Sequence, residues 1–299
     1  MKRPCYVVDA FSAEPFLGNP AGVLLEAADL DSGAMQRIAN ELKHSETAFP
    51  LPAREPTTAL HLRWFTPESE VAFCGHATLA AFHVLVEEAR RIRVPEQGTV
   101  RIAFTCKSGK LQAELSRQKG KLRVLIETPA SRFEPAQVPA EVLAALGLVP
   151  EVLDPKIAPQ RSAILEGNLY LCLRDHEALA RCKPQARELI ALGKEMGVAG
   201  FVAYTLNPKA GVDVAVRCFF PGYGILEDPV TGSAAGQLGA LLQSALPQAL
   251  PRKLVFTQGE EMGRPGRVEL EVRPDAAPGS VRGWIGGAAV TVLRGELEL

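Results

Sequence analysis

Short runs rich in strand-forming residues dominate the chain and predict β-strands, and the run at residues 60–64 also alternates between apolar and polar residues. In the first half of the chain, these runs occupy residues 5–11, 60–64, 100–106, 111–115 and 122–126. In the second half they occupy residues 200–205, 212–219, 254–257, 268–272 and 288–293. Polar or glycine-containing turns separate them. The pattern therefore predicts a chain rich in strands, with few helices.

Three longer segments have the i, i+3, i+4, i+7 spacing of an amphipathic helix. In the first, Asp31 or Ser32 can cap a helix whose apolar stripe includes Met35 and Leu42. The other two begin at Gly75 and Gly232 and carry almost no charge in their first turns. They are therefore expected to be buried within a sheet or barrel, with His83 in the core. A short helix is expected at residues 141–146.

The order of these segments occurs twice. Cys74-Gly75-His76 and Thr231-Gly232-Ser233 each open an apolar helix and each follow an aromatic-proline turn. A helix-to-strand segment at 38–49 also recurs at 190–201, an offset of 152, which aligns Glu46 with Val198. The duplication predicts two domains, residues 1–127 and 128–299, with the proline-rich stretch 129–159 as their crossover. The last strand is expected to be able to return to the first half.

The composition and charge of the chain argue against several classes of partner. Apolar residues make up 47% of 299 residues, and the net charge is −1 without a basic stripe, so neither nucleic acid nor an anionic membrane is an expected partner. No apolar run approaches the ~20 residues that span a bilayer. Because Met1 leads into a strand-like run and the six cysteines lack a CxxC spacing, a reduced, cytoplasmic protein is expected. The five histidines form no zinc-binding pattern, and no metal site is predicted.

The two glycines mark candidate anion sites. A glycine at a helix start lets a ligand approach the backbone, where the N–H groups of the first turn bind anions. Each glycine alone is also compatible with an ordinary tight turn. Because the arrangement is duplicated, it favours a cleft in which Gly75, Gly232 and Ser233 hold one anionic ligand.

Four polar side chains near these glycines carry the candidate chemistry. Glu46 is either a solvated turn carboxylate or a general base in the cleft. Asp228 can cap the following turn or orient a histidine, and His76 is the histidine beside an anion site. Cys74 precedes a helix start, where a lowered pKa would let it act as a base. Its counterpart is Thr231, so a racemase with a thiol on each face would lack one of its two cysteines.

Several motifs run through the chain in order. They are Asp9-Ala10-Phe11, Phe16 with Gly18-Asn19-Pro20-Ala21-Gly22-Val23, Ser45-Glu46-Thr47, Phe65-Thr66-Pro67 with Glu70 and Cys74-Gly75-His76-Ala77-Thr78, Glu227-Asp228-Pro229-Val230-Thr231-Gly232-Ser233-Ala234, and Gly286-Gly287 with Gly295-Glu296-Leu297. Together they resemble the PhzF-like (phenazine biosynthesis-like) family from end to end.

The resemblance implies an α+β, diaminopimelate-epimerase-like fold, with two pseudo-symmetric domains. Each domain has a curved sheet around a central helix, and the active site lies between the domains. It also implies a cofactor-independent isomerase of a small carboxylate, typified by dihydro-hydroxyanthranilate, in which Glu46 moves a proton between carbons. The supporting polar groups are Ser45, His76 and Asp228. The substrate-binding positions are Gly75, Gly232, Ser233, Asn19 and Cys74.

Two other functions remain open on the sequence. One is a racemase, epimerase or dehydratase that uses Cys74, and the other is a protein that binds a carboxylate without catalysis. Relatives in the wider superfamily imply a homodimer. No nucleic acid, membrane or cofactor is expected as a partner.

Overall fold

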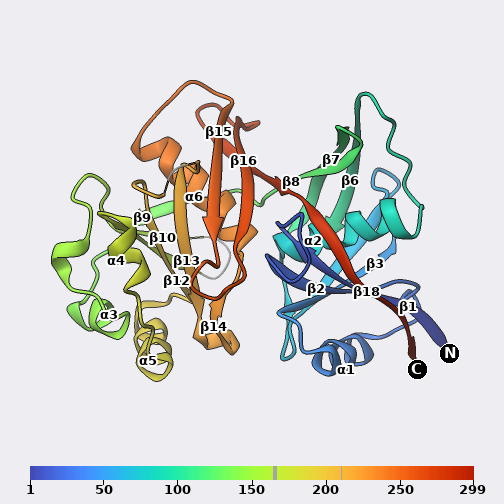
Figure 1. Ribbon diagram of the computed structural model, residues 1–299, viewed down its shortest axis with the longest axis horizontal. Coiled ribbons are helices and arrows are strands. Elements are labelled where there is room, and N and C mark those ends of the chain that lie inside the picture. Colours follow the sequence, from blue (N-terminus) through green and yellow to red (C-terminus); the bar gives the residue numbers. More distant parts are fainter. Residues whose placement is uncertain (164–166, 210) are drawn as a thin grey trace. The chain divides into compact units, whose positions relative to one another are not determined.

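The computed structural model describes residues 1–163, 167–209 and 211–299 (Figure 1). The chain divides into two compact units. Unit 1 comprises Met1–Pro129 and Trp284–Leu299, and unit 2 comprises Ala130–Gly283. The last strand pairs antiparallel with the first, Lys2 opposite Glu298, so the C-terminal segment belongs to unit 1.

Unit 1 is a mixed sheet with two helices. Its strands are β1 (Lys2–Ala10), β2 (Asn19–Leu24), β3 (Glu46–Pro52), β4 (Leu60–Phe65), β5 (Glu70–Val71), β6 (Thr99–Cys106), β7 (Gly109–Gln118), β8 (Lys121–Glu127), the second half of β17 (Val281–Gly287) and β18 (Ala289–Glu298). The sheet order is β18-β1-β2-β3-β4-β6-β7-β8-β17, with β5 also paired to β4. The β2–β3 and β4–β6 pairs are parallel because a helix crosses over between their strands.

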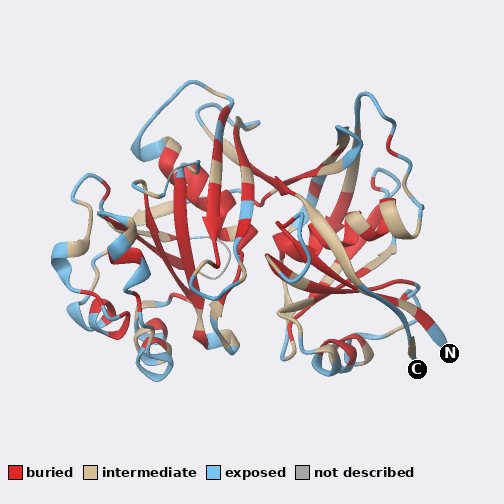
Figure 2. Ribbon diagram, in the orientation of Figure 1, coloured by how far each residue is buried: buried red, intermediate tan, exposed pale blue. Residues whose placement is uncertain are grey.

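The central helix of unit 1 is α2 (Gly75–His83), which continues into the π-helical turn η1 (Val84–Glu88). It contacts β1, β2, β3, β8 and β18, and all its residues except His83 are buried (Figure 2). This confirms the burial expected from its charge-free first turn. The core position expected for His83 is wrong, because this last residue of the helix is only half-buried and lies 3.1 Å from the Thr291 hydroxyl on β18.

Unit 2 repeats this plan. Its strands are β9 (Phe133–Pro135), β10 (Gln160–Ser162), β11 (Asn168–Leu173), β12 (Gly200–Thr205), β13 (Val214–Phe220), β14 (Ile225–Asp228), β15 (Arg252–Gln258) and β16 (Gly266–Pro274). Its helices are α3 (Ala140–Ala145), α4 (His176–Ala180), α5 (Ala186–Met196) and α6 (Gly232–Ala245), with short 3₁₀ turns η2 (Pro150–Val152) and η3 (Pro221–Tyr223). The sheet order is β9-β10-β11-β12-β13-β15-β16, and the β11–β12 and β13–β15 pairs are parallel.

The segments that recur along the chain therefore form the same arrangement of strands and helices in both units. In each unit a parallel strand pair is joined through helices, an antiparallel pair follows, and a second parallel pair is joined through the glycine helix. The structure corrects the alignment of the two copies. Thr47 is paired with Phe65 as Phe201 is with Phe219, and the left-handed residues Lys43 and Gly197 both end the preceding helix.

These landmarks give an offset of 154 instead of 152, and the counterpart of Glu46 is Gly200, not Val198. The Ile-Ala pairs that suggested 152 do not occupy equivalent turns of the two helices. A Cβ atom on Gly200 would lie 2.3 Å from the ring of Phe220, so an aromatic ring fills the space that a side chain would need. Only unit 1 carries a carboxylate at this position.

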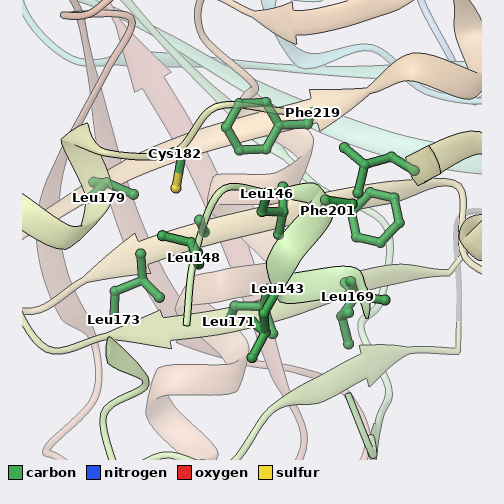
Figure 3. Close-up of a cluster of buried hydrophobic side chains, with 14 of the residues drawn as sticks. Leu143, Leu146, Leu148, Leu169, Leu171, Leu173, Leu179, Cys182, Phe201 and Phe219 are labelled. Atoms are coloured by element: carbon green, nitrogen blue, oxygen red, sulfur yellow. The ribbon is translucent and has the colours of Figure 1, made fainter. Parts of the chain in front are cut away.

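Each sheet has helices on both faces. On the outer face of unit 1, Met35, Ile38 and Ala39 of α1 (Ser32–Leu42) pack against Phe49 and Phe65. Asp31 caps α1 by accepting a hydrogen bond from the Ala34 N–H, as predicted. In unit 2, the outer core gathers Leu169, Leu171, Leu173, Phe201 and Phe219 of the sheet with α3, α4 and α5 (Figure 3). The intervening Tyr170 faces α6 and donates to Gln237 at 2.7 Å.

Candidate active site

The two glycine helices begin without a side-chain cap. Cys74 and Thr231 are the N-cap residues in extended conformation, and neither side chain accepts a hydrogen bond from the first turn. The N–H groups of that turn consequently have no partner inside the helix. The positive end of the helix dipole lies at the same place, so each start is suited to a negative charge.

Four polar side chains gather at the start of α2. Glu46 is the first residue of β3 and Asn19 the first residue of β2. His76 Nε2 lies 3.1 Å from Glu46 Oε2, and His76 Nδ1 lies 3.2 Å from Asn19 Nδ2 and 3.4 Å from Cys74 Sγ. The side chain of His76 is only 4% exposed, and that of Glu46 is 13% exposed. Folding therefore brings together four of the nine residues predicted for the site.

The pKa of the Cys74 thiol is raised, whereas the sequence predicts a lowered value. Burial, together with the negative charge of Glu46, raises the pKa of Cys74 to about 11. The lowered thiol pKa predicted for this helix start is wrong, because desolvation and Glu46 outweigh the contacts with His76 and the Ala77 backbone that lower the pKa. Burial also lowers the pKa of His76, but its interactions with Cys74 and with the carboxylate of Glu46 outweigh burial and hold that pKa well above its ordinary value.

The imidazole of His76 contacts each of the other three side chains of this cluster. Cys74 and Glu46 lie against different ring nitrogens, although the donor atoms of Glu46, Cys74 and His76 are all within 4.8 Å of one another. A single metal ion binds one nitrogen of a ring, so this arrangement suits proton handling better than chelation. Nε2 bears a proton both in the protonated ring and in the neutral ring that accepts from Asn19 on Nδ1, but its N–H is not aligned on Glu46 Oε2.

The loop between β1 and β2 sets the position of Asn19. Phe11 and Phe16 both have left-handed backbones, with φ of 63° and 66°. The buried carboxylate of Asp9 accepts the Phe16 N–H at 2.6 Å and holds the loop. Gly18 closes it, since a Cβ atom there would lie 2.2 Å from the Ala10 carbonyl oxygen. The loop thus returns the chain to the pairing of Ala10 with Asn19 at the base of the site.

Ser45 immediately precedes β3 and is half-buried. Its place beside Glu46 follows from the chain alone. The catalytic role predicted for it stays a prediction.

A second polar cluster forms at the start of α6 in unit 2. Thr231 donates from its hydroxyl to Asp228 Oδ2 at 2.6 Å, and its N–H donates to Gln258 Oε1 at 3.0 Å. Gln258 Nε2 donates to the Asp228 carbonyl at 2.8 Å and to Thr231 Oγ1 at 3.1 Å. Asp228 thus anchors the turn before the helix. Gly232 is buried and Ser233 is half-buried in the first turn.

Sequence reasoning missed Gln258. It ends β15, about 27 residues after the motif it supports, and no local pattern marks it. Only the parallel pairing of β15 with β13 carries it to Asp228 and Thr231. The same pairing places Cys218 beside Gln258, and burial raises the pKa of that thiol.

Known proteins share both the motifs and the fold. The model of the PhzC-PhzF family, described as phenazine biosynthesis-like protein, matches residues 8–295. The chain belongs to the PhzC-PhzF family. It is 34% identical over 303 residues to an uncharacterized isomerase of Salmonella typhimurium, covering 99% of this chain and 98% of that protein. It is 32% identical to phenazine biosynthesis-like domain-containing protein 2 of Mus musculus, with 99% of each chain covered.

Solved structures place this PhzC-PhzF protein in the α+β, diaminopimelate-epimerase-like class. A PhzF-family phenazine biosynthesis protein of Bacillus anthracis superposes with a TM-score of 0.88 at 26% identity, with both chains fully covered. A hydroxyproline epimerase of Agrobacterium vitis shares the fold with a TM-score of 0.72 at 13% identity, covering 100% of this chain and 93% of that one. The protein is an enzyme of the isomerase kind. Within the described residues, no helix is both long and apolar enough to cross a membrane.

Proposed function

We propose that this protein is a cofactor-independent isomerase of a small carboxylate, in which Glu46 moves a proton between two carbons of the substrate. The observation that supports this proposal is that two neighbouring buried polar atoms lack a hydrogen-bond partner among the described residues. Glu46 Oε2 and His76 Nε2 lie 3.1 Å apart, yet neither has an aligned hydrogen-bond partner within the described chain. Buried polar atoms normally have such a partner, so a pair without one is suited to a ligand.

Chemistry favours Glu46 over Cys74 as the base. A thiol with a pKa of about 11 is protonated at neutral pH and is a poor proton acceptor. A racemase that uses two thiols would also need a second cysteine, and Thr231 occupies that place. Glu46, in contrast, is an acceptor at the edge of the cluster, with part of its side chain exposed.

The supporting groups have separate roles in this proposal. His76 lies against Glu46 through Nε2 at 3.1 Å and holds the carboxylate by charge, and Asn19 fixes the histidine ring through Nδ1. Removal of a proton from a carbon next to a carboxylate or carbonyl places negative charge on oxygen, and first-turn N–H groups of a helix stabilise such charge. By family resemblance, Gly75, Gly232 and Ser233 hold the substrate, while Ser45 and Asp228 assist. A cytoplasmic homodimer belongs to the same proposal.

Proton exchange in D₂O tests the assignment. Small carboxylates, beginning with dihydro-hydroxyanthranilate and followed by amino and hydroxy acids, are incubated with the wild type and with Glu46→Gln. NMR then follows deuterium into each carbon. The wild type is expected to exchange, and Glu46→Gln is expected to exchange at least about a hundredfold more slowly, because an acid–base group is lost.

Cys74→Ser is the matched control, since it changes a neighbour of the same histidine. It is expected to keep most of the exchange. Full exchange in Glu46→Gln together with loss in Cys74→Ser would overturn the proposal and move the protein to thiol chemistry.

A further inference from the structure

An ion pair in unit 1 lies just before the start of α2. Arg63 on β4 binds Glu70 on β5 through two contacts, Nε to Oε1 at 2.7 Å and Nη2 to Oε2 at 3.0 Å. The guanidinium lies 4.9 Å from the centre of the Phe65 ring and also donates to Ser32 Oγ at the start of α1. Both charged side chains are mostly buried, and the arginine lowers the pKa of Glu70.

An ion pair of the same design lies before α6 in unit 2. Arg217 on β13 binds Glu227 on β14, Nε to Oε1 and Nη2 to Oε2, each at 2.8 Å. Its guanidinium lies 5.2 Å from the centre of the Phe219 ring. Nη1 donates to the carbonyls of Leu179 and Cys182 at 3.1 and 2.9 Å, at the end of α4. Arg217 is 6% exposed, so this pair is more deeply buried than the first.

The spacing shows that the pairs are equivalent despite a change in chain length. In both units the arginine stands two positions before a phenylalanine, and the glutamate stands five positions before the glycine that opens the helix. The turn between phenylalanine and glutamate spans five positions in unit 1 and eight in unit 2. A longer turn would ordinarily displace the glutamate. The two-contact pair nevertheless recurs, which indicates that it constrains the segment leading to the helix.

The helix starts need such a constraint, because their own caps do not supply one. Neither Cys74 nor Thr231 bonds to the first turn through its side chain. Bidentate arginine–carboxylate pairs fix both distance and orientation, and a planar guanidinium stacked on an aromatic ring has few alternative positions. Each pair joins the strand that carries the arginine to the short strand that leads into the helix.

We propose that the Arg63–Glu70 and Arg217–Glu227 pairs are positioning devices for the two glycine helices, and that the first keeps His76 aligned with Glu46. Neither pair touches the candidate reacting atoms. This inference rests on the proposed function only for its kinetic readout, so the principal test does not depend on turnover.

The principal test is the titration of His76 followed by side-chain ¹⁵N NMR in the whole protein. In Glu70→Gln, the pKa of His76 is expected to fall toward its ordinary value, because the ring no longer stays in contact with Glu46. Arg63→Lys keeps the charge but loses the planar fork, and is expected to give a smaller shift. Asp29→Asn is the control, since Asp29 forms a two-contact pair with Arg3 on β1, away from α2. It is expected to leave the titration unchanged.

Hydrogen exchange gives the equivalent test in unit 2. Glu227→Gln is expected to speed exchange of the Ala235 amide, which donates to the Thr231 carbonyl at 3.1 Å, at least about tenfold relative to Asp275→Asn, which breaks the pair with Arg282. If Glu70→Gln does not fold, Glu70→Asp and Arg63→Lys supply the His76 measurement. An unchanged His76 titration in every folded variant of the first pair, or amide exchange in Glu227→Gln equal to that of its control, would overturn the inference.

Turnover, once a substrate is known, separates positioning from mere stability. Per folded molecule, Glu70→Gln is expected to lower kcat at least about tenfold with KM changed less than about threefold, because a misplaced catalytic group chiefly slows the chemical step. A lower melting temperature with unchanged kcat would overturn the positioning role. Failure of the proposed function would instead show as absent exchange in the wild type, with the NMR result intact.

Discussion

Thr231 is the N-cap residue of the second glycine helix, and its contacts give it a structural role. The residue is 8% exposed, and its hydroxyl donates to the Asp228 carboxylate at 2.6 Å and accepts from Gln258 at 3.1 Å. We predict that Thr231→Val, which keeps the shape and removes the hydroxyl, destabilises unit 2. The variant leaves a buried carboxylate without its short donor and an amide N–H without one of its acceptors.

The loss of these two hydrogen bonds gives the expected decrease in the free energy of unfolding. A bond to a charged group contributes about 1.5–3 kcal/mol and a neutral one about 0.5–1.5 kcal/mol. The free energy of unfolding should therefore fall by about 2–4 kcal/mol, a roughly 30- to 700-fold change in the unfolding equilibrium. With a urea dependence of about 2 kcal/mol per molar, the midpoint should fall by about 1–2 M.

Thr231→Ser is the matched control for this prediction. It keeps the hydroxyl and loses one methyl group, so it should cost about 1 kcal/mol. Urea unfolding followed by circular dichroism compares the two variants. If Thr231→Val proves as stable as Thr231→Ser, the hydroxyl does not carry the turn before α6, and the explanation given for this threonine is wrong.

Three further changes test the fold and the site. Gly200→Ala should destabilise unit 2 by about 1–3 kcal/mol in urea unfolding, because the new methyl would overlap the Phe220 ring. The stability that His76 contributes beside Glu46 should be full below about pH 6.5 and lost as pH rises through its raised folded-state pKa, so the difference between wild type and His76→Asn in urea should shrink as pH rises above about 6.5. Asp31→Ala should cost about 1 kcal/mol of stability by thermal unfolding, because α1 loses its cap.

Each of these changes has a control in the same chain. Gly222→Ala adds a methyl where no atom lies within 4 Å and should be close to neutral. Glu46→Gln should flatten the pH dependence attributed to His76, and an unaltered slope would contradict the assignment. Asp31→Asn keeps a capping oxygen and should lose much less stability than Asp31→Ala.

The duplication of the chain and its main helices can be predicted from the order of residues alone. The strand-rich runs located ten of the eighteen strands of the described residues to within a few residues but missed others, among them β2, β11 and β17, and the charge-free starts at Gly75 and Gly232 correctly predicted buried helices. The family motifs correctly indicated the fold and the isomerase class. These signals are local or repeated, so the order of residues along the chain is sufficient to display them.

Which residues contact one another across the fold follows only from the three-dimensional structure. The offset of 154 and the match of Glu46 with Gly200 required strand register, because helix turns and strand pairs, not identical letters, define equivalent positions. The protonated state of Cys74 required its burial to be known, since a helix start by itself favours the opposite ionisation. Gln258 reaches Asp228 only through a parallel strand pair, and Arg63 and Arg217 find their glutamates across turns of different length. Contacts of this kind depend on distances in space that spacing along the chain does not encode.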